Sequence, residues 1–357
     1  MWHVIIAYVP GRALESGSMD SGLVDLRSDT VTRPTPEMRK AMCSAEVGDD
    51  GYREDPTVLA LEEAYAERVG KESALFVPSG TMANQIAVRA LCPPGTLVVA
   101  GRRQHMVIYE QCGAAQNTGV QFHLVDDDDG TISPDEISWA IEAARHHQPR
   151  VSLVCVEQTH MPAGGTPWSL EALRSVSQAA MGTALHMDGA RLFNAEVATG
   201  VGAAEFADDF TTVMTCMSKG LCAPVGSVLA GPSTVIEVAR LERQRLGGGM
   251  RQAGVVAAAG LVALRTMIDR LAEDHARARR LAEAVAERWP ASGCDPASTR
   301  TNIVVFSHGD PAGLIADLAA EGVLVGTIAP GVCRLVTHHD VDDAGVERAM
   351  SAIAGAP

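Results

Sequence analysis

The chain has 357 residues, 46% of them hydrophobic, and a formal net charge of −15 from 44 acidic and 29 basic residues. This length suffices for one large domain and a smaller one. The acidic balance argues against a broad nucleic-acid surface, which needs clustered Lys and Arg. No stretch approaches the roughly 20 apolar residues of a membrane helix.

Residues 1–22 are expected to form an N-terminal extension ahead of the folded chain. The apolar run at residues 2–10 is too short to span a bilayer, and it lacks the basic start and small-residue cleavage site of a signal peptide. Met19 would be a more natural start.

Strands and helices then alternate along the chain. Asp55 and Pro56 open a helix that runs to about Val69, with the aspartate as N-cap and the proline at the first position. Further helices are expected at 82–91 and from about 133 and 169, and strands at 74–77, 97–100, 151–156, 185–188, 212–215 and 227–230. This alternation favours an α/β fold with a mostly parallel sheet covered by helices on both faces.

A small C-terminal α+β domain is expected to follow. A helical stretch from about residue 252 to 289 leads into it, with strands at 303–306, 323–325 and 333–336 and helices at 311–320 and 342–354. The predicted organisation is therefore an extension (1–22), a large domain (23–265) and a small domain (266–357).

Two other patterns bear on metals and on the redox compartment. The four aspartates at 126–129 lack the alternating ligands and closing glutamate of an EF-hand, so we interpret them as a solvated turn. The eight cysteines form no Cys-x-x-Cys pair and mostly sit in apolar segments. We expect reduced, buried thiols in a cytoplasmic protein, and no metal site.

Lys219 carries the strongest functional signal. It follows an apolar run and lies among small residues, while Asp188 ends an earlier predicted strand. A lysine and an aspartate at strand ends in this order are typical of a pyridoxal phosphate (PLP) site. The lysine binds the cofactor aldehyde covalently, and the carboxylate keeps the pyridine nitrogen protonated.

Two glycine-containing segments could hold the phosphate of such a cofactor. Ser79, Gly80 and Thr81 join a predicted strand to a helix, where backbone N–H groups and hydroxyls can bind phosphate; an ordinary capped turn is the alternative. Residues 247–249 are three consecutive glycines, and Arg251 follows them. Arg251 would reach a phosphate, in this chain or in a neighbouring subunit, unless the segment is only a hinge.

Six ordered segments together resemble the L-threonine aldolase family of fold-type I PLP enzymes: residues 26–35, 46–56, 79–85, 186–191, 215–227 and 247–254. The resemblance runs from about residue 24 to the end. It implies an aspartate-aminotransferase-like fold, with PLP as cofactor. The implied reaction is retro-aldol cleavage of L-threonine or L-allo-threonine to glycine and an aldehyde.

The same resemblance implies a role for each matched position. Lys219 would bind PLP, Asp188 its ring nitrogen, and the segment from Ser79 to Thr81 its phosphate. His105 would lie against the ring, and His147 near the substrate hydroxyl. Arg191 and Arg334 would lie near the cofactor or the substrate carboxylate, with Ser28 assisting. Tyr52 and Arg251 would come from a neighbouring subunit of a dimer or tetramer.

Some of these roles have alternatives. Either arginine could form a structural ion pair, and the hydroxyl base could be His105, His147 or water; the adjacent His146 leaves the alignment of His147 open. Gln158 and Met161 stand where many members have asparagines, which bears on side-chain preference. The competing functions are β-elimination, racemisation, a transaldolase-type transfer, and a non-catalytic PLP-fold protein.

Overall fold

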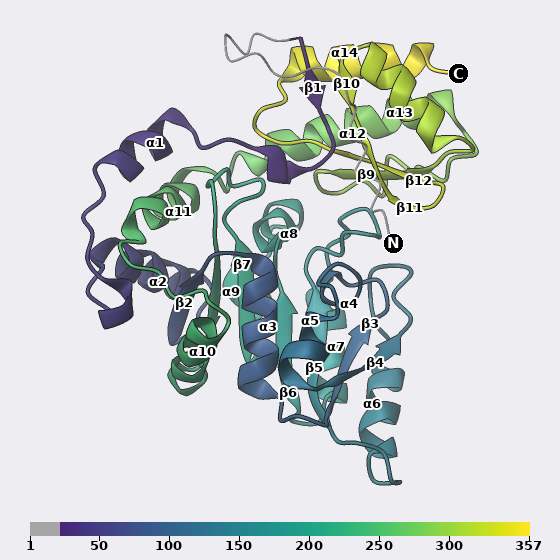
Figure 1. Cartoon of the computed structure of the whole chain (residues 1–357). Helices are drawn as coiled ribbons and strands as arrows, with labels where there is room; N and C mark the ends of the chain where they lie inside the picture. Colours follow the sequence, from purple (N-terminus) through teal and green to yellow (C-terminus); the bar gives the residue numbers. More distant parts are fainter. Residues whose placement is uncertain (1–21) are drawn as a thin grey trace.

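A seven-stranded sheet forms the centre of the larger part of the molecule (Figure 1). The computed structural model describes residues 22–357, so the predicted extension lies outside the described residues apart from Gly22. The strands are β2 (Ser73–Val77), β3 (Leu97–Gly101), β4 (Gln121–Val125), β5 (Val151–Glu157), β6 (Ala184–Asp188), β7 (Thr212–Cys216) and β8 (Ser227–Gly231), in the order β2-β8-β7-β6-β5-β3-β4.

The predicted mostly parallel sheet is confirmed. Among the described strands of this sheet, β8 alone runs antiparallel to its neighbours, β7 and β2, and the other adjacent pairs are parallel. Strands β3, β5, β7 and β8 are buried along their whole length, as expected for strands covered on both faces. The edge strand β4 is largely exposed or half-buried.

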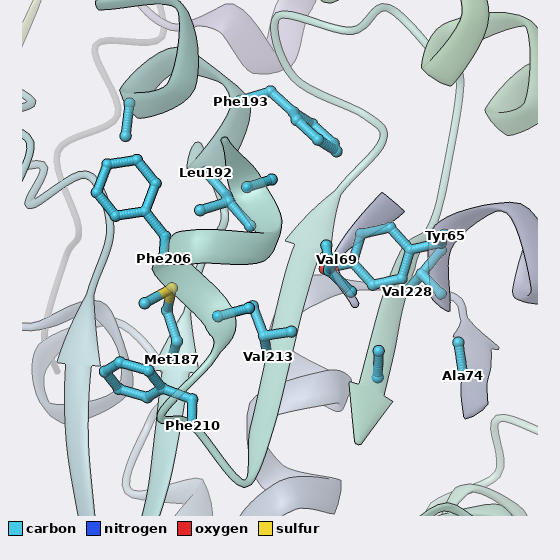
Figure 2. Packing of buried hydrophobic residues seen from close by; sticks show 14 of the residues in the cluster. Tyr65, Val69, Ala74, Met187, Leu192, Phe193, Phe206, Phe210, Val213 and Val228 are labelled. Atoms are coloured by element: carbon cyan, nitrogen blue, oxygen red, sulfur yellow. The ribbon is translucent and has the colours of Figure 1, made fainter. Parts of the chain in front are cut away.

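Helices cover both faces of the sheet. One face carries α3 (Gly80–Leu91), α5 (Gly113–Thr118) and α10 (Ser233–Arg245). The other carries α1 (Pro36–Cys43), α2 (Pro56–Arg68), α6 (Pro134–Ala143), α7 (Leu170–Ala179), α8 (Leu192–Thr199), α9 (Ala203–Ala207) and α11 (Gly254–Thr266). Figure 2 shows part of the apolar cluster on this second face, where Phe206 and Phe210 pack near Met187 and Val213 of the sheet.

The start of α2 shows how the sequence sets an element boundary. Asp55 is the predicted N-cap, and its carboxylate accepts hydrogen bonds from the backbone N–H groups of Thr57 and Val58. Pro56 occupies the first helical position, where its missing N–H costs nothing. The same carboxylate accepts from Gly254 N at 2.8 Å, so it also anchors the first residue of α11.

A smaller unit lies above the large sheet in Figure 1. It contains the antiparallel sheet β11-β12-β9 and a second apolar cluster. Its elements are α12 (Leu271–Arg288), β9 (Ile303–Ser307), α13 (Pro311–Ala320), β10 (Val323–Leu324), β11 (Gly326–Ala329), β12 (Val332–Val336) and α14 (Asp343–Gly355). The predicted division at residues 265 and 266 remains a prediction.

An N-terminal strand joins this C-terminal unit. β1 (Val24–Asp25) pairs in parallel with β10, with Val24 opposite Val323. Val24 and Leu26 are buried in the second apolar cluster rather than in the core of the large sheet. The two segments come from opposite ends of the described chain.

Three sequence expectations differ from the structure. The helical stretch at 252–289 is two helices, because residues 267–270 turn the chain from the large core, which holds Met267 and Ile268, toward the small one. Asp127 is not part of a solvated turn: it is buried, with His160 Nε2 at 2.9 Å from its Oδ2. Cys43 and Cys112 are exposed, not buried.

Candidate active site

Several of the predicted site residues lie at the carboxyl ends of the parallel strands. Glu157 is the last residue of β5, Asp188 is the last of β6, and Lys219 follows the end of β7 by three residues. Carboxyl ends of adjacent parallel strands lie at one edge of a sheet, which is where α/β proteins bind ligands. Lys219 is half-buried and lines a small cavity together with Arg191 and Cys216.

Asp188 is held as a buried hydrogen-bond acceptor. Its Oδ2 accepts from Asn84 Nδ2 at 2.7 Å, and its Oδ1 accepts from Ala190 N at 3.1 Å. It is 3% exposed. Donors on both oxygens favour an anionic carboxylate, which is the state needed to pair with a protonated ring nitrogen.

His105 lies beside Asp188 and begins α4 (His105–Ile108). Its backbone N donates to Glu157 Oε2 at 2.7 Å, and its Nδ1 lies 3.1 Å from Glu110 Oε1. A ring nitrogen of His105 and one carboxylate oxygen each of Glu110 and Asp188 all lie within 4.8 Å of one another. The structure therefore brings the predicted ring-facing histidine and the predicted ring-nitrogen partner together.

The start of α3 approaches the segment that carries Lys219. Ser79 caps the helix, and its Oγ accepts from Met82 N, which leaves the N–H groups of Gly80 and Thr81 without partners inside the helix. A Cβ on Gly80 would lie 2.8 Å from Cys216 Sγ, so this position needs glycine for close packing on β7. The predicted phosphate segment is thus adjacent to the strand end that precedes Lys219.

The glycine-rich segment touches the same helix start. A Cβ on Gly248 would lie 2.3 Å from Met82 Sδ. Arg251, a few residues on, is largely exposed, with Nη1 3.9 Å from Asp49 Oδ1. Its guanidinium is therefore available to groups outside this chain.

Arg191 forms a buried, two-point ion pair with Asp29. Its Nε donates to Asp29 Oδ2 at 2.7 Å and its Nη2 to Oδ1 at 2.6 Å. Asn302 Nδ2 donates to the same carboxylate at 3.2 Å. Burial alone would raise the pKa of Asp29, but Arg191 holds it well below its usual range. Two nitrogens of the Arg191 guanidinium are therefore already bonded within the chain, which agrees with the alternative that this arginine forms a structural ion pair.

Arg334 has different surroundings. It lies on β12, and its Nη2 donates to the carbonyl oxygen of Arg27 at 2.8 Å. Among the described residues, no carboxylate lies within ion-pair distance of it, and its buried Nε has no hydrogen-bond partner. Burial and the charge of Arg191 lower its pKa. A half-buried cation without a counter-charge among the described residues is a favourable place for an anionic ligand.

The remaining predicted site residues are less central. Ser28 caps the short helix η1 (Asp29–Val31) and accepts from Thr30. Tyr52 ends the short helix η2 (Asp50–Tyr52) and is 77% exposed. His147 lies in the loop before β5, at the edge of the sheet opposite to Asp188 and Lys219, and is exposed. This chain therefore does not bring His147 together with Asp188 and Lys219, because a loop that enters a strand lies at its amino end, and its role near the substrate hydroxyl stays a prediction.

Residues 25–308 match the family model described as beta-eliminating lyase. The chain belongs to this family. It is 42% identical over 339 residues to low-specificity L-threonine aldolase 1 of Arabidopsis thaliana, covering 92% of this chain and 94% of the relative. It is 40% identical over 324 residues to the low specificity L-threonine aldolase of Escherichia coli strain K12, covering 89% and 95%.

The fold agrees with the family. A threonine aldolase structure from Leishmania major superposes with a TM-score of 0.81 at 20% identity, covering 92% of this chain and 98% of that one. The predicted fold class, α/β with a mostly parallel sheet and the fold-type I arrangement, is confirmed.

Sequence reasoning missed several residues of the candidate site. Asn84, Glu110, Glu157 and Asp29 all contact predicted site residues, yet none was assigned a role. Asn84 stands one helical turn after Gly80, and Glu110 just over one turn after His105. A search for polar residues one turn from each predicted contact would have found these two. Asp29 has no such signal, because it meets Arg191 across 162 positions of sequence.

Proposed function

We propose that this protein is a PLP-dependent threonine aldolase that cleaves L-threonine or L-allo-threonine to glycine and acetaldehyde. The observation that carries the proposal is the meeting of Asp188 and Lys219 at one edge of the sheet, beside the start of α3. The relatives named low-specificity L-threonine aldolase, which match over most of their length, support it.

The residues present fit the cofactor. Lys219 offers an amine at a cavity, Asp188 a buried carboxylate already held by two donors, and Gly80 and Thr81 free N–H groups at a helix start. Lys219 would hold the aldehyde carbon, Asp188 the ring nitrogen and the α3 start the phosphate. When bound, PLP supplies an electron-accepting ring for the pair released by the broken bond.

The chain's own residues would select which bond breaks. Arg334 would bind the substrate carboxylate, since its Nε has no partner among the described residues. A carboxylate fixed at one point, with the amine fixed near Lys219, limits rotation about the Cα and so presents the Cα–Cβ bond. His105 would accept the β-hydroxyl proton at Nε2, because its Nδ1 faces Glu110.

The test is a product analysis with the PLP-loaded enzyme. L-threonine, L-allo-threonine and the phenylserine isomers are supplied, and aldehyde, glycine, keto acid and D-isomers are measured. Equal yields of aldehyde and glycine support the proposal. Keto acid and ammonia without aldehyde would indicate β-elimination, and D-isomers would indicate racemisation. Activity that appears only with added aldehyde would indicate an aldol transfer. A purified protein that never takes up PLP would support the non-catalytic reading.

We further propose that the enzyme works as a homodimer or homotetramer with sites at subunit interfaces. Tyr52 and Arg251 are exposed in the single chain, and their segments are in contact, since Asp50 N donates to Arg251 O at 3.2 Å. Sedimentation of the purified protein measures the oligomeric state, and a monomer with full activity would exclude this proposal.

Five buried thiols without disulfide partners suit a reducing compartment, so we propose a cytoplasmic location.

A further inference from the structure

Glu110 is a buried carboxylate for which the proposed reaction has no role so far. It follows α4 at a bend, and its side chain is 1% exposed. Its Oε1 lies 2.8 Å from Asn84 Nδ2 and 3.1 Å from His105 Nδ1. A buried carboxylate is costly unless its contacts compensate for lost hydration, so these two contacts need an explanation.

The orientation of Asn84 follows from its neighbours. Its Nδ2 lies 2.8 Å from Glu110 Oε1 and 2.7 Å from Asp188 Oδ2, so each amide hydrogen has one carboxylate. Its Oδ1 lies 3.0 Å from His186 Nε2. The reverse orientation would place the amide oxygen against two carboxylates, which repels, so nitrogen faces both acids and His186 must donate from Nε2.

His186 is consistent with that donor role. Its Nδ1 lies 2.9 Å from Thr212 Oγ1, a hydroxyl that can donate to it. Complete burial lowers the pKa of His186 to about 4, so the ring is neutral and carries its proton on Nε2. The chain of hydrogen bonds from Thr212 through His186 therefore fixes Asn84, and Asn84 fixes the positions of both carboxylates.

The tautomer of His105 also follows from its neighbours. Glu110 Oε1 accepts from Asn84 Nδ2, and an ionised Glu110 can only accept, so the proton between Glu110 and His105 belongs to Nδ1. Burial raises the pKa of Glu110, and the hydrogen bonds from His105 and Asn84 lower it. The backbone N of His105 is held by Glu157, which prevents the ring from moving away. Nε2 is then the one ring atom that can exchange a proton with a ligand.

We propose that Glu110 is a positioning residue: it holds His105 in the Nδ1–H form, leaving Nε2 to exchange protons, and through the shared amide of Asn84 it joins His105 and Asp188 in one hydrogen-bonded unit. The inference rests on the proposed function only in placing His105 at the reacting groups. The tautomer itself is a property of the protein.

The charges around His105 agree with this role. The titratable groups that face it are Glu110, Asp188 of β6, Glu157 of β5, Lys219 after β7 and Tyr109, whose ring centre lies 5.4 Å from that of His105. Burial lowers the pKa of His105, but the Glu110 hydrogen bond and the Asp188 charge outweigh burial, so the pKa lies above its ordinary value.

The test measures His105 directly in the PLP-loaded enzyme by NMR with ¹⁵N-labelled histidine. A His105→Asn variant identifies the signal. We expect the neutral ring to show a protonated Nδ1 and a bare Nε2. In Glu110→Gln, which keeps an acceptor but removes the charge, we expect the His105 pKa to fall by about one unit.

Kinetics supply a second readout. The acid limb of kcat/KM for aldehyde release should move to lower pH in Glu110→Gln by the same amount as the NMR titration. Glu62→Gln is the matched control, because Glu62 is also a buried carboxylate bonded to a backbone N–H and an arginine, but lies away from the site. It should leave the His105 pKa and the acid limb in place.

Three results would overturn the inference. They are a neutral wild-type His105 protonated on Nε2, an unchanged His105 pKa in Glu110→Gln, and an equal shift in the Glu62→Gln control. If Glu110→Gln does not fold, the NMR measurement of the His105 tautomer in the wild-type protein still tests the inference. A wild-type enzyme that shows the expected tautomer but releases no aldehyde would contradict the proposed function and leave the role of Glu110 in place.

Discussion

Alanine substitutions at Arg191 and Arg334 should have different effects, although both arginines were expected to meet the substrate. Arg334 has no carboxylate partner among the described residues, and its Nε is unpaired. Arg191 is bonded at two points to the buried Asp29. We therefore expect Arg334→Ala to reduce catalysis, and Arg191→Ala to reduce stability in addition to any loss of activity.

The magnitudes follow from the contacts. Losing a hydrogen bond to a charged group costs about 1.5–3 kcal/mol, which corresponds to a kcat/KM that is roughly 10- to 160-fold lower for Arg334→Ala. Its stability should change by about 1.5 kcal/mol, the lower end for one hydrogen bond to a charged group, because Arg334 is half-buried and loses only the bond to the Arg27 carbonyl. Removing Arg191 leaves Asp29 buried without its cation, which costs about 3–5 kcal/mol.

Two assays separate the effects. Aldehyde release with L-threonine gives kcat/KM, and urea unfolding of the PLP-loaded protein gives the free energy of unfolding. Arg279→Ala is the control, because among residues 22–357 this exposed arginine has one ion-pair contact, 3.7 Å from Glu283, and its loss should change stability by less than about 0.5 kcal/mol. Unchanged kcat/KM in Arg334→Ala, or unchanged stability in Arg191→Ala, would refute the reasoning.

Three further predictions concern the cofactor and pH. Lys219→Ala should abolish turnover and the visible absorbance of the lysine-bound cofactor; full activity would remove Lys219 from its role. Gly80→Ala should cost about 1–3 kcal/mol of stability, because the new methyl meets Cys216 Sγ. It should also weaken PLP binding, measured by fluorescence titration. Unchanged stability and unchanged PLP affinity would contradict the close packing. Burial lowers the pKa of His186 to about 4 from 6.5, so as pH falls through this window the unfolded chain gains a proton that the folded one does not. The unfolding free energy should therefore drop by roughly 2 kcal/mol from pH 7 to pH 5 through this residue, and His186→Gln should lack that part of the drop in urea titrations at the two pH values.

Strand ends were predictable from local patterns. The apolar runs that became β6 and β7 stop at Asp188 and just before Lys219, and parallel strands place such ends together. The same rule places His147 at the other edge of the sheet, because that residue precedes β5 instead of following it.

Partners that are distant in sequence were not predictable. Arg191 and Arg334 each follow a plausible pattern, and what distinguishes them is Asp29, which no periodicity connects to either. Asn84 and Asp188 are 104 positions apart, and their contact depends on how α3 packs against the sheet. Long-range polar contacts of this kind arise only once the core has placed the backbones.

The pairing of β1 with β10 has a consequence for how the chain reaches its final state. Val24 is among the first described residues to leave the ribosome, yet its partner, Val323, emerges near the end of synthesis. Closing so long a loop carries a large entropic cost before any contact compensates for it. Asp29 lies only a few residues beyond β1, so its bond to Arg191 should also form late. We therefore expect the cofactor-binding edge of the enzyme to mature only after the last segments have been made.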